Sequence, residues 1–155
     1  MKLQKSTVFA LHAVLELASD SDRQLSTGEI AERYGISTHH LAKVMRRLVR
    51  GGLVQSMRGA GGGYRFCGNA NRTTLLDVIV LFEELGPELD FVEGDGAEST
   101  PIGLALQAVR DEIDDLTRAT LRSITLNTLI KNAERRARSR KAEPTEPARA
   151  VGARA

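Results

Sequence analysis

The sequence predicts a mainly α-helical protein with a small β-hairpin, arranged as a winged helix-turn-helix plus a long C-terminal dimerisation helix. Three features favour this class. Two short helical patterns meet at a glycine within residues 25–50, and a glycine-rich segment between two strand-like stretches follows at residues 53–66. Apolar residues then recur at alternating spacings of four and three over residues 102–120.

The chain begins with an amphipathic helix. Apolar and small residues recur at helical spacing over residues 3–18, so we expect this helix to pack beneath the helix-turn-helix. His12 lies on its less apolar side. Because one isolated imidazole does not make a metal site, we interpret His12 as a surface or interface residue.

The helix-turn-helix follows a short polar loop. Ser26 or Thr27 can cap its first helix, and the free N–H groups near Thr27 could bind a DNA phosphate. Ala31 is the small residue needed where the two helices touch, and Gly35 tolerates the positive φ of the turn. Leu41 is the apolar residue that holds the second helix down.

The second helix, residues 38–50, has two contrasting faces, and Ser37 is suited to cap it. One face is apolar, whereas the other carries four Lys or Arg side chains, two His and no carboxylate. A helix in the major groove needs this pattern, with donors for base edges and cations for phosphates. The alternative is a basic surface helix without a partner.

A β-hairpin wing is expected after Gly51 and Gly52, with strands at residues 53–56 and 63–66. Glycines let its tip approach a sugar-phosphate backbone, and Arg58 suits a narrow minor groove. The residues expected to contact double-stranded DNA are Thr27, Ser37, Thr38, His39, His40, Lys43, Arg46, Arg47 and Arg58.

A linker, a helix and an acidic loop come next. Thr73 or Thr74 begins a strongly apolar helix that Gly86 and Pro87 are expected to stop. Residues 83–98 are rich in Asp and Glu. They lack the residue order of a calcium-binding loop, so we interpret them as a flexible solvated loop.

The C-terminal part is expected to pair two copies of the chain. Thr100 and Pro101 mark a helix start, and the apolar seam over residues 102–120 suits a dimer contact or packing within the subunit. Thr125 can cap a final helix that ends near Arg135. Residues 136–155 are rich in Ala, Arg and Pro, and we expect a disordered basic tail that adds nonspecific DNA affinity or is merely solubilising.

Charge is distributed unevenly along the 155 residues. The net charge is +5 over residues 1–66, −8 over 67–130 and +5 over 131–155. We therefore expect a DNA-binding domain at 1–66, a linker, acidic loop and dimerisation helices at 67–135, and the tail at 136–155. No stretch has the length of a membrane span, no signal-peptide pattern is present, and one cysteine fits a reducing compartment, so we expect a cytoplasmic protein.

Residues 1 to about 132 resemble the Rrf-two family of bacterial winged-helix regulators. The resemblance rests on the segments MKLQKSTVFALHAVLELA, TGEIAERYGIS, HHLAKVMRRLVRGGLV, RGAGGGYRF, TLLDVI and TLNTL. The HHLAKV stretch is similar to the branch that contains nitric-oxide-sensing repressors. The resemblance implies a homodimer with crossing C-terminal helices, which acts as a repressor on a palindromic operator.

The sequence departs from that family at its sensing site. Several members hold an iron–sulfur cluster with three cysteines in the loop before the dimer helix, and some use an acidic residue at the start of the first helix. Here residues 86–101 contain no cysteine, and Val8 stands at the helix position. Because a cluster requires several thiolate or imidazole ligands, we expect no cluster, no other cofactor and no metal.

Several kinds of signal could therefore control this regulator in place of a cluster. Oxidation of Cys67 beside the wing could disturb DNA binding, although a thiol needs an electropositive environment to be reactive and could equally be inert. An unidentified small-molecule effector, a protein partner and constitutive repression are further alternatives. A winged helix used only for protein contacts is the main alternative to a DNA reader. The sequence shows no convergent set of acid, base and nucleophile, so we do not expect an enzyme.

Overall fold

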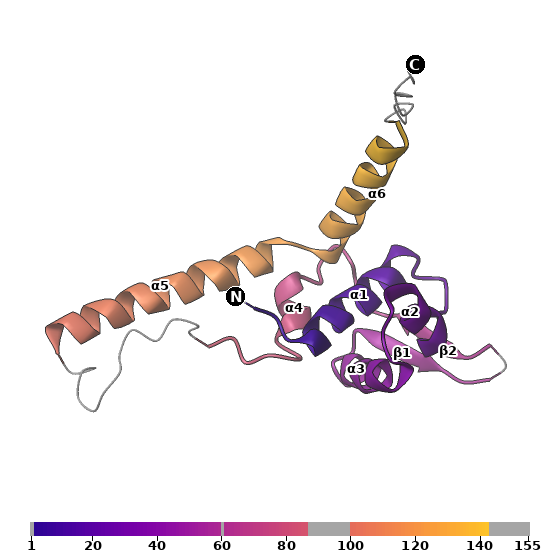
Figure 1. Ribbon diagram of the computed structural model, residues 1–155, viewed down its shortest axis with the longest axis horizontal. Helices are drawn as coiled ribbons and strands as arrows, with labels where there is room; N and C mark the ends of the chain where they lie inside the picture. Colours follow the sequence, from indigo (N-terminus) through magenta and orange to yellow (C-terminus); the bar gives the residue numbers. More distant parts are fainter. Residues whose placement is uncertain (1, 60, 87–99, 143–155) are drawn as a thin grey trace, which may run out of the picture.

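The computed structural model describes residues 2–59, 61–86 and 100–142. Six helices and one hairpin follow in the order α1 (Lys5–Ser19), α2 (Thr27–Tyr34), α3 (Thr38–Arg50), β1 (Val54–Met57), β2 (Gly63–Phe66), α4 (Leu75–Ile79), α5 (Pro101–Ser123) and α6 (Leu126–Ala142). Figure 1 shows α1–α4 and the hairpin gathered in one body, from which α5 and α6 leave in different directions. The predicted class, a winged helix-turn-helix with a long C-terminal helix, is confirmed.

The core of the body lies between α1, α2 and α3. Its fully buried members include Leu17 of α1, Ile30 of α2 and three residues of α3, namely Leu41, Met45 and Leu48. These residues recur at helical spacing, so each helix places one apolar stripe on the others. This packing fixes α3 with its apolar side inward.

The turn between α2 and α3 has the predicted geometry. Gly35 ends α2 in the left-handed conformation, with φ of 62°, which a residue with a Cβ adopts only at a cost. The backbone N–H of Ile36 donates to the Ala31 carbonyl oxygen at 2.9 Å. Ala31 and Leu41 are both buried, as their small and apolar side chains predict.

Side-chain capping differs between the two helices. Ser26 and Glu29 form a capping box at the start of α2: the Ser26 hydroxyl accepts from the Glu29 N–H, and the Ser26 N–H donates to the Glu29 carboxylate. Ser37 stands at the N-cap position of α3 but its hydroxyl caps no N–H, so the predicted side-chain cap is wrong. Its carbonyl oxygen instead accepts from the Leu41 N–H at 2.9 Å.

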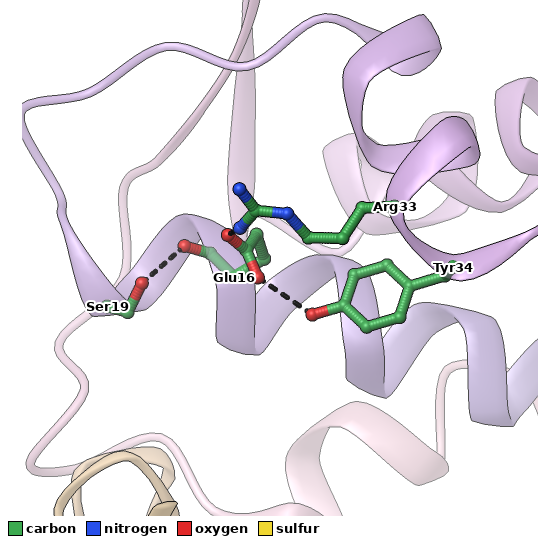
Figure 2. Close-up of polar contacts among 4 residues, drawn as sticks. All are labelled: Glu16, Ser19, Arg33 and Tyr34. Atoms are coloured by element: carbon green, nitrogen blue, oxygen red, sulfur yellow. Dashed lines mark hydrogen bonds and ion pairs between the residues drawn. The ribbon is translucent and has the colours of Figure 1, made fainter. Parts of the chain in front are cut away.

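A half-buried carboxylate on α1 fastens the end of α2 (Figure 2). Glu16 accepts a hydrogen bond from the Tyr34 hydroxyl at 2.7 Å and forms an ion pair with Arg33. The Ser19 hydroxyl donates to the Glu16 carbonyl oxygen at 2.7 Å, and the His12 ring stacks on Tyr34 with centroids 4.6 Å apart. His12 thus acts as a contact residue between helices.

The wing is a two-stranded antiparallel hairpin attached to the start of α2. Val54 pairs with Phe66 and Met57 with Gly63, so β1 lies one residue later than predicted and β2 has the predicted bounds. Leu25 and Tyr64 exchange two backbone hydrogen bonds of 3.1 and 2.8 Å. The hairpin is therefore held to the helix-turn-helix as well as within itself.

Helix α4 is shorter than predicted. Thr74 and Asp77 form a capping box at its start, but the helix ends at Ile79 rather than near Leu85. The chain then turns, which places Phe82 in the core and lets Glu83 accept from the Gln4 N–H at 2.7 Å and the Thr7 hydroxyl. These tertiary contacts outweigh the helical pattern. Most of the predicted acidic loop, residues 87–99, lies outside the described residues.

The two C-terminal helices begin at capping residues. Thr100 caps α5 by accepting from the Gly103 N–H at 3.0 Å, with Pro101 at the first helical position, as predicted. The Thr125 hydroxyl accepts from the Thr128 N–H at 3.2 Å at the start of α6. Helix α6 continues to Ala142, so residues 136–142 are helical and the prediction of disorder there is wrong; residues 143–155 lie outside the described residues.

Candidate nucleic-acid interface

The outer side of α3 carries a row of exposed side chains, which we call the reading face: His39, Lys43, Arg46 and Arg50. All four are exposed, and they follow one another at three- and four-residue spacing along the helix. The opposite side of the same helix is buried against α1 and α2. Packing therefore fixes which side chains of α3 point outward.

The reading face is positive and uncompensated. Within the described part of the chain, Lys43, Arg46 and Arg50 form no ion pair, and Arg46 only donates from Nε to the Ala42 carbonyl oxygen at 3.4 Å. An unpaired cation on a protein surface is available to an anion from outside. This side of α3 can thus meet phosphates and hydrogen-bond acceptors of base edges.

Two predicted residues sit apart from this row. The ring of His40 meets Phe9 of α1 edge-on at 5.3 Å between centroids. The guanidinium of Arg47 lies 4.8 Å from the centroid of Phe82, a cation–π contact. Both side chains remain exposed, but each is engaged by its own protein. The structure therefore does not bring His40 and Arg47 to the reading face.

The helix N-termini supply a second group of predicted contacts. Ser37 and Thr38 are exposed at the start of α3, next to His39. Thr27 is half-buried and opens α2, where the capping box uses the N–H groups of Ser26 and Glu29. Backbone N–H groups at such a helix start favour a phosphate.

The wing supplies the third group. Arg58 is exposed at the tip, directly after β1, and is followed by Gly59 and Gly61 with φ of 118° and 81°. Figure 1 shows the hairpin extending from the body beyond α2. Ala60, between the two glycines, lies outside the described residues. An arginine on a thin hairpin tip, beside glycines that adopt positive φ, can enter a narrow groove that a helix cannot.

Two residues with a role in this arrangement were not predicted. A Cβ at Gly63 would stand 2.6 Å from the Leu25 carbonyl oxygen, so glycine at this position lets the wing dock on the segment before α2. The repeated glycines of residues 61–63 were the available signal. Phe82 positions Arg47, and no sequence signal distinguishes it from an ordinary apolar residue of a helix.

Cys67 follows β2 at the base of the wing. It is a free, exposed thiol whose Sγ lies 3.3 Å from the Gly52 carbonyl oxygen, while its backbone N–H donates to Leu53 at 3.0 Å. Among the described residues, no three His, Cys, Asp or Glu side chains are placed to hold a metal ion. With one cysteine in the whole sequence, the chain does not fit a cluster held by three of its own thiolates.

Comparison with known proteins decides the family. A model of the Rrf2 family, described as iron-dependent transcriptional regulators, matches residues 3–132. The chain belongs to the Rrf2 family. It is therefore a helix-turn-helix transcriptional regulator, in agreement with the resemblance of its wing and helix-turn-helix. The narrower similarity to nitric-oxide-sensing repressors stays a prediction.

Named relatives are regulators as well. The chain is 51% identical over 138 residues to the HTH-type transcriptional regulator BadM of Rhodopseudomonas palustris, covering 88% of this chain and 86% of that protein. It is 36% identical over 138 residues to the HTH-type regulator IscR of Pectobacterium atrosepticum, covering 86% and 82% of the two chains. None of these relatives is an enzyme, which agrees with the expected class.

Solved structures share the fold. The global cysteine regulator CymR of B. subtilis superposes with a TM-score of 0.71 at 26% identity, covering 85% of this chain and 98% of that chain. IscR of T. potens gives a TM-score of 0.70 at 25% identity and covers 94% of both chains. Among the described residues, no helix combines the length and the apolar character that crossing a membrane requires.

Proposed function

We propose that this Rrf2-family protein is a homodimeric, sequence-specific repressor that binds a palindromic operator in double-stranded DNA without an iron–sulfur cluster. The reading face carries the proposal, since it is exposed, cationic and backed by a fixed core. Thr27, Ser37 and Thr38 at the helix N-termini, together with Arg58 of the wing, add phosphate and minor-groove contacts. We place the regulator in the cytoplasm, where a bacterial chromosome is accessible.

A second copy is proposed along α5. Ile102, Val109, Ile113 and Leu116 of its predicted seam are 75%, 48%, 40% and 61% exposed in the single chain. An apolar stripe of this length is unfavourable in water, and a two-fold partner would cover it with the same stripe. Such a dimer presents two copies of α3, so the operator should be pseudo-symmetric.

The operator can be found by capturing genomic fragments on the purified full chain at low ionic strength. We expect enrichment of fragments that share a sequence with two-fold symmetry. Lys43→Ala should then weaken binding by about tenfold to a hundredfold and relax preference at one base position of each half-site. Lys5→Ala removes an equal charge from α1 and serves as the control. Base reading would be contradicted if the wild type and the Lys43→Ala variant both bound all sequences with equal affinity.

The dimer can be tested with a pair of leucines on α5. Leu116 lies on the seam, whereas Leu104 is 56% exposed on the opposite side of the helix. Leu116→Glu should give a monomer in light scattering and weaken operator binding, because it places a charge in the dimer contact. Leu104→Glu should remain dimeric. A wild type that is monomeric at the concentrations of the DNA-binding assay would overturn this part of the proposal.

Three alternatives predict outcomes of their own. If Cys67 senses oxidants, mild oxidation should release the operator from the wild type but not from Cys67→Ser, because its thiol lies at the base of the wing. If the winged helix serves only protein contacts, no genomic fragment will be enriched. A small-molecule effector would appear as a compound that changes operator affinity.

A further inference from the structure

From its second turn onward, α6 carries a dense group of cations, which we call the basic helix end: Lys131, Arg135, Arg136, Arg138 and Arg140. All five are exposed, and Glu134 is the single acidic residue among residues 131–140. In the described part of the chain none of the five forms an ion pair, and Arg135 only donates to the Asn132 side chain at 3.2 Å.

Within the described part of the chain, the end of α6 is not packed against another element. The first turns of the helix pack on α1, with Leu126 fully buried and Leu129 and Ile130 half-buried. From Ala133 to Arg140 every residue is exposed. Like charges also stand four residues apart at Lys131 and Arg135 and again at Arg136 and Arg140, and Glu134, four residues before Arg138, offsets only part of this repulsion. An external polyanion would relieve that repulsion.

The arrangement of the cations favours a nucleic acid over a protein. At about 100° per residue, Lys131, Arg135 and Arg138 lie on one side of the helix, and Arg136 and Arg140 lie on the other. Protein interfaces need an apolar or aromatic centre, and residues 133–140 offer only two alanines among their apolar side chains. Binding to phosphates needs only charge within reach.

The position of the basic helix end decides which DNA it can meet. Figure 1 shows α6 leaving the body on the side opposite to α3 and extending away from it. DNA lying along α3 therefore runs on the other side of the body. We infer that the basic helix end is a sequence-independent binding element for a second segment of double-stranded DNA. This inference rests on the proposed operator binding, and it would let one bound dimer bridge two duplexes.

A sequential capture experiment tests this inference. Wild-type full chain is loaded on an immobilised operator duplex and washed, and a fluorescent duplex without the operator is then added at low salt. We expect the wild type to retain the second duplex. The variant R135Q/R136Q/R138Q should load equally well and retain at least tenfold less of it. The control K5Q/R72Q/R122Q removes three exposed cations elsewhere and should behave as wild type.

Each other outcome has a defined meaning. Normal loading without capture by the wild type, or equal capture by the R135Q/R136Q/R138Q variant, overturns the inference. If polyglutamate displaces the second duplex as effectively as unlabelled DNA does at equal charge concentration, the assignment of the basic helix end to DNA is overturned. If the salt slope measured on the operator alone falls in magnitude by up to about 5.4 in this variant, at about 0.9 for each of the six cations removed from a dimer, the helix binds the same duplex and the inference is overturned. Failure of any protein to load would instead refute the proposed operator binding.

Discussion

Replacement of Gly63 by alanine tests how the wing is docked. Gly63 is the first residue of β2, and an added Cβ would stand 2.6 Å from the Leu25 carbonyl oxygen and 3.1 Å from the Ser26 backbone nitrogen. These are backbone atoms at the start of the helix-turn-helix, so no side-chain rotation relieves the contact. The chain has two ways to respond.

Both responses have a similar cost. If the hairpin moves away, the two backbone hydrogen bonds between Leu25 and Tyr64 are lost, which costs about 2 kcal/mol at roughly 1 kcal/mol each. If the hairpin stays, crowding of the added carbon costs about 1–3 kcal/mol. We therefore expect Gly63→Ala to lower the free energy of unfolding by about 2 kcal/mol, which is about 4–8 °C in Tm for a chain of this size.

Thermal and urea unfolding followed by circular dichroism at helix wavelengths measure this loss. Gly86→Ala is the control, because a Cβ there meets nothing within 4 Å, and its effect should stay within about 0.5 kcal/mol. Operator affinity of the folded Gly63 variant should fall as well, since the wing carries Arg58. A Gly63 variant as stable as wild type would refute the docking argument.

Three further substitutions probe capping and the wing. Ser26→Ala removes the hydroxyl that accepts from the Glu29 N–H and should cost about 1 kcal/mol in urea unfolding; an unchanged midpoint would count against the capping box. The hydrogen bond from the Ser26 backbone N–H, followed by that with the Ser26 side chain, holds the pKa of Glu29 below its ordinary value. The carboxylate therefore stabilises the fold at pH values above the ordinary carboxyl range, and this contribution fades as the pH falls through the lowered pKa. Glu29→Gln should therefore be less stable than wild type at neutral pH, and the difference in unfolding midpoint should shrink on acidification; a constant difference would exclude this linkage. Arg58→Ala should weaken operator binding in anisotropy titrations, and a loss confined to nonspecific DNA would argue against minor-groove contact.

The sequence was most informative where local chemistry and packing agree. Helix α3 has the predicted bounds because its apolar face, its C-terminal glycines and its core partners all specify the same helix. Thr100 and Pro101 likewise start α5 where expected. The reading face follows from the same periodicity, since fixing the buried side of α3 fixes the exposed side.

Tertiary contacts explain where the sequence was less informative. Helix α4 stops early because Phe82 contacts Arg47 of α3 and Glu83 accepts a hydrogen bond from Gln4 at the start of α1. No local sequence pattern predicts these contacts. Arg47 is drawn to Phe82 for the same reason. Helix α6 extends past Arg135 because Ala, Arg and Lys are strong helix formers, a preference that the low-complexity composition of the tail obscured.

Salt dependence of operator binding tests the central claim most directly. The wild-type chain is titrated by fluorescence anisotropy with its selected operator and with a scrambled duplex between 50 and 200 mM salt. We predict tighter binding to the operator at every concentration and a logarithmic slope of about −0.9 for each phosphate contacted, with a smaller slope for Arg46→Gln. Affinity that is independent of salt, or equal for both duplexes throughout, would contradict the account of α3 as a DNA-reading helix.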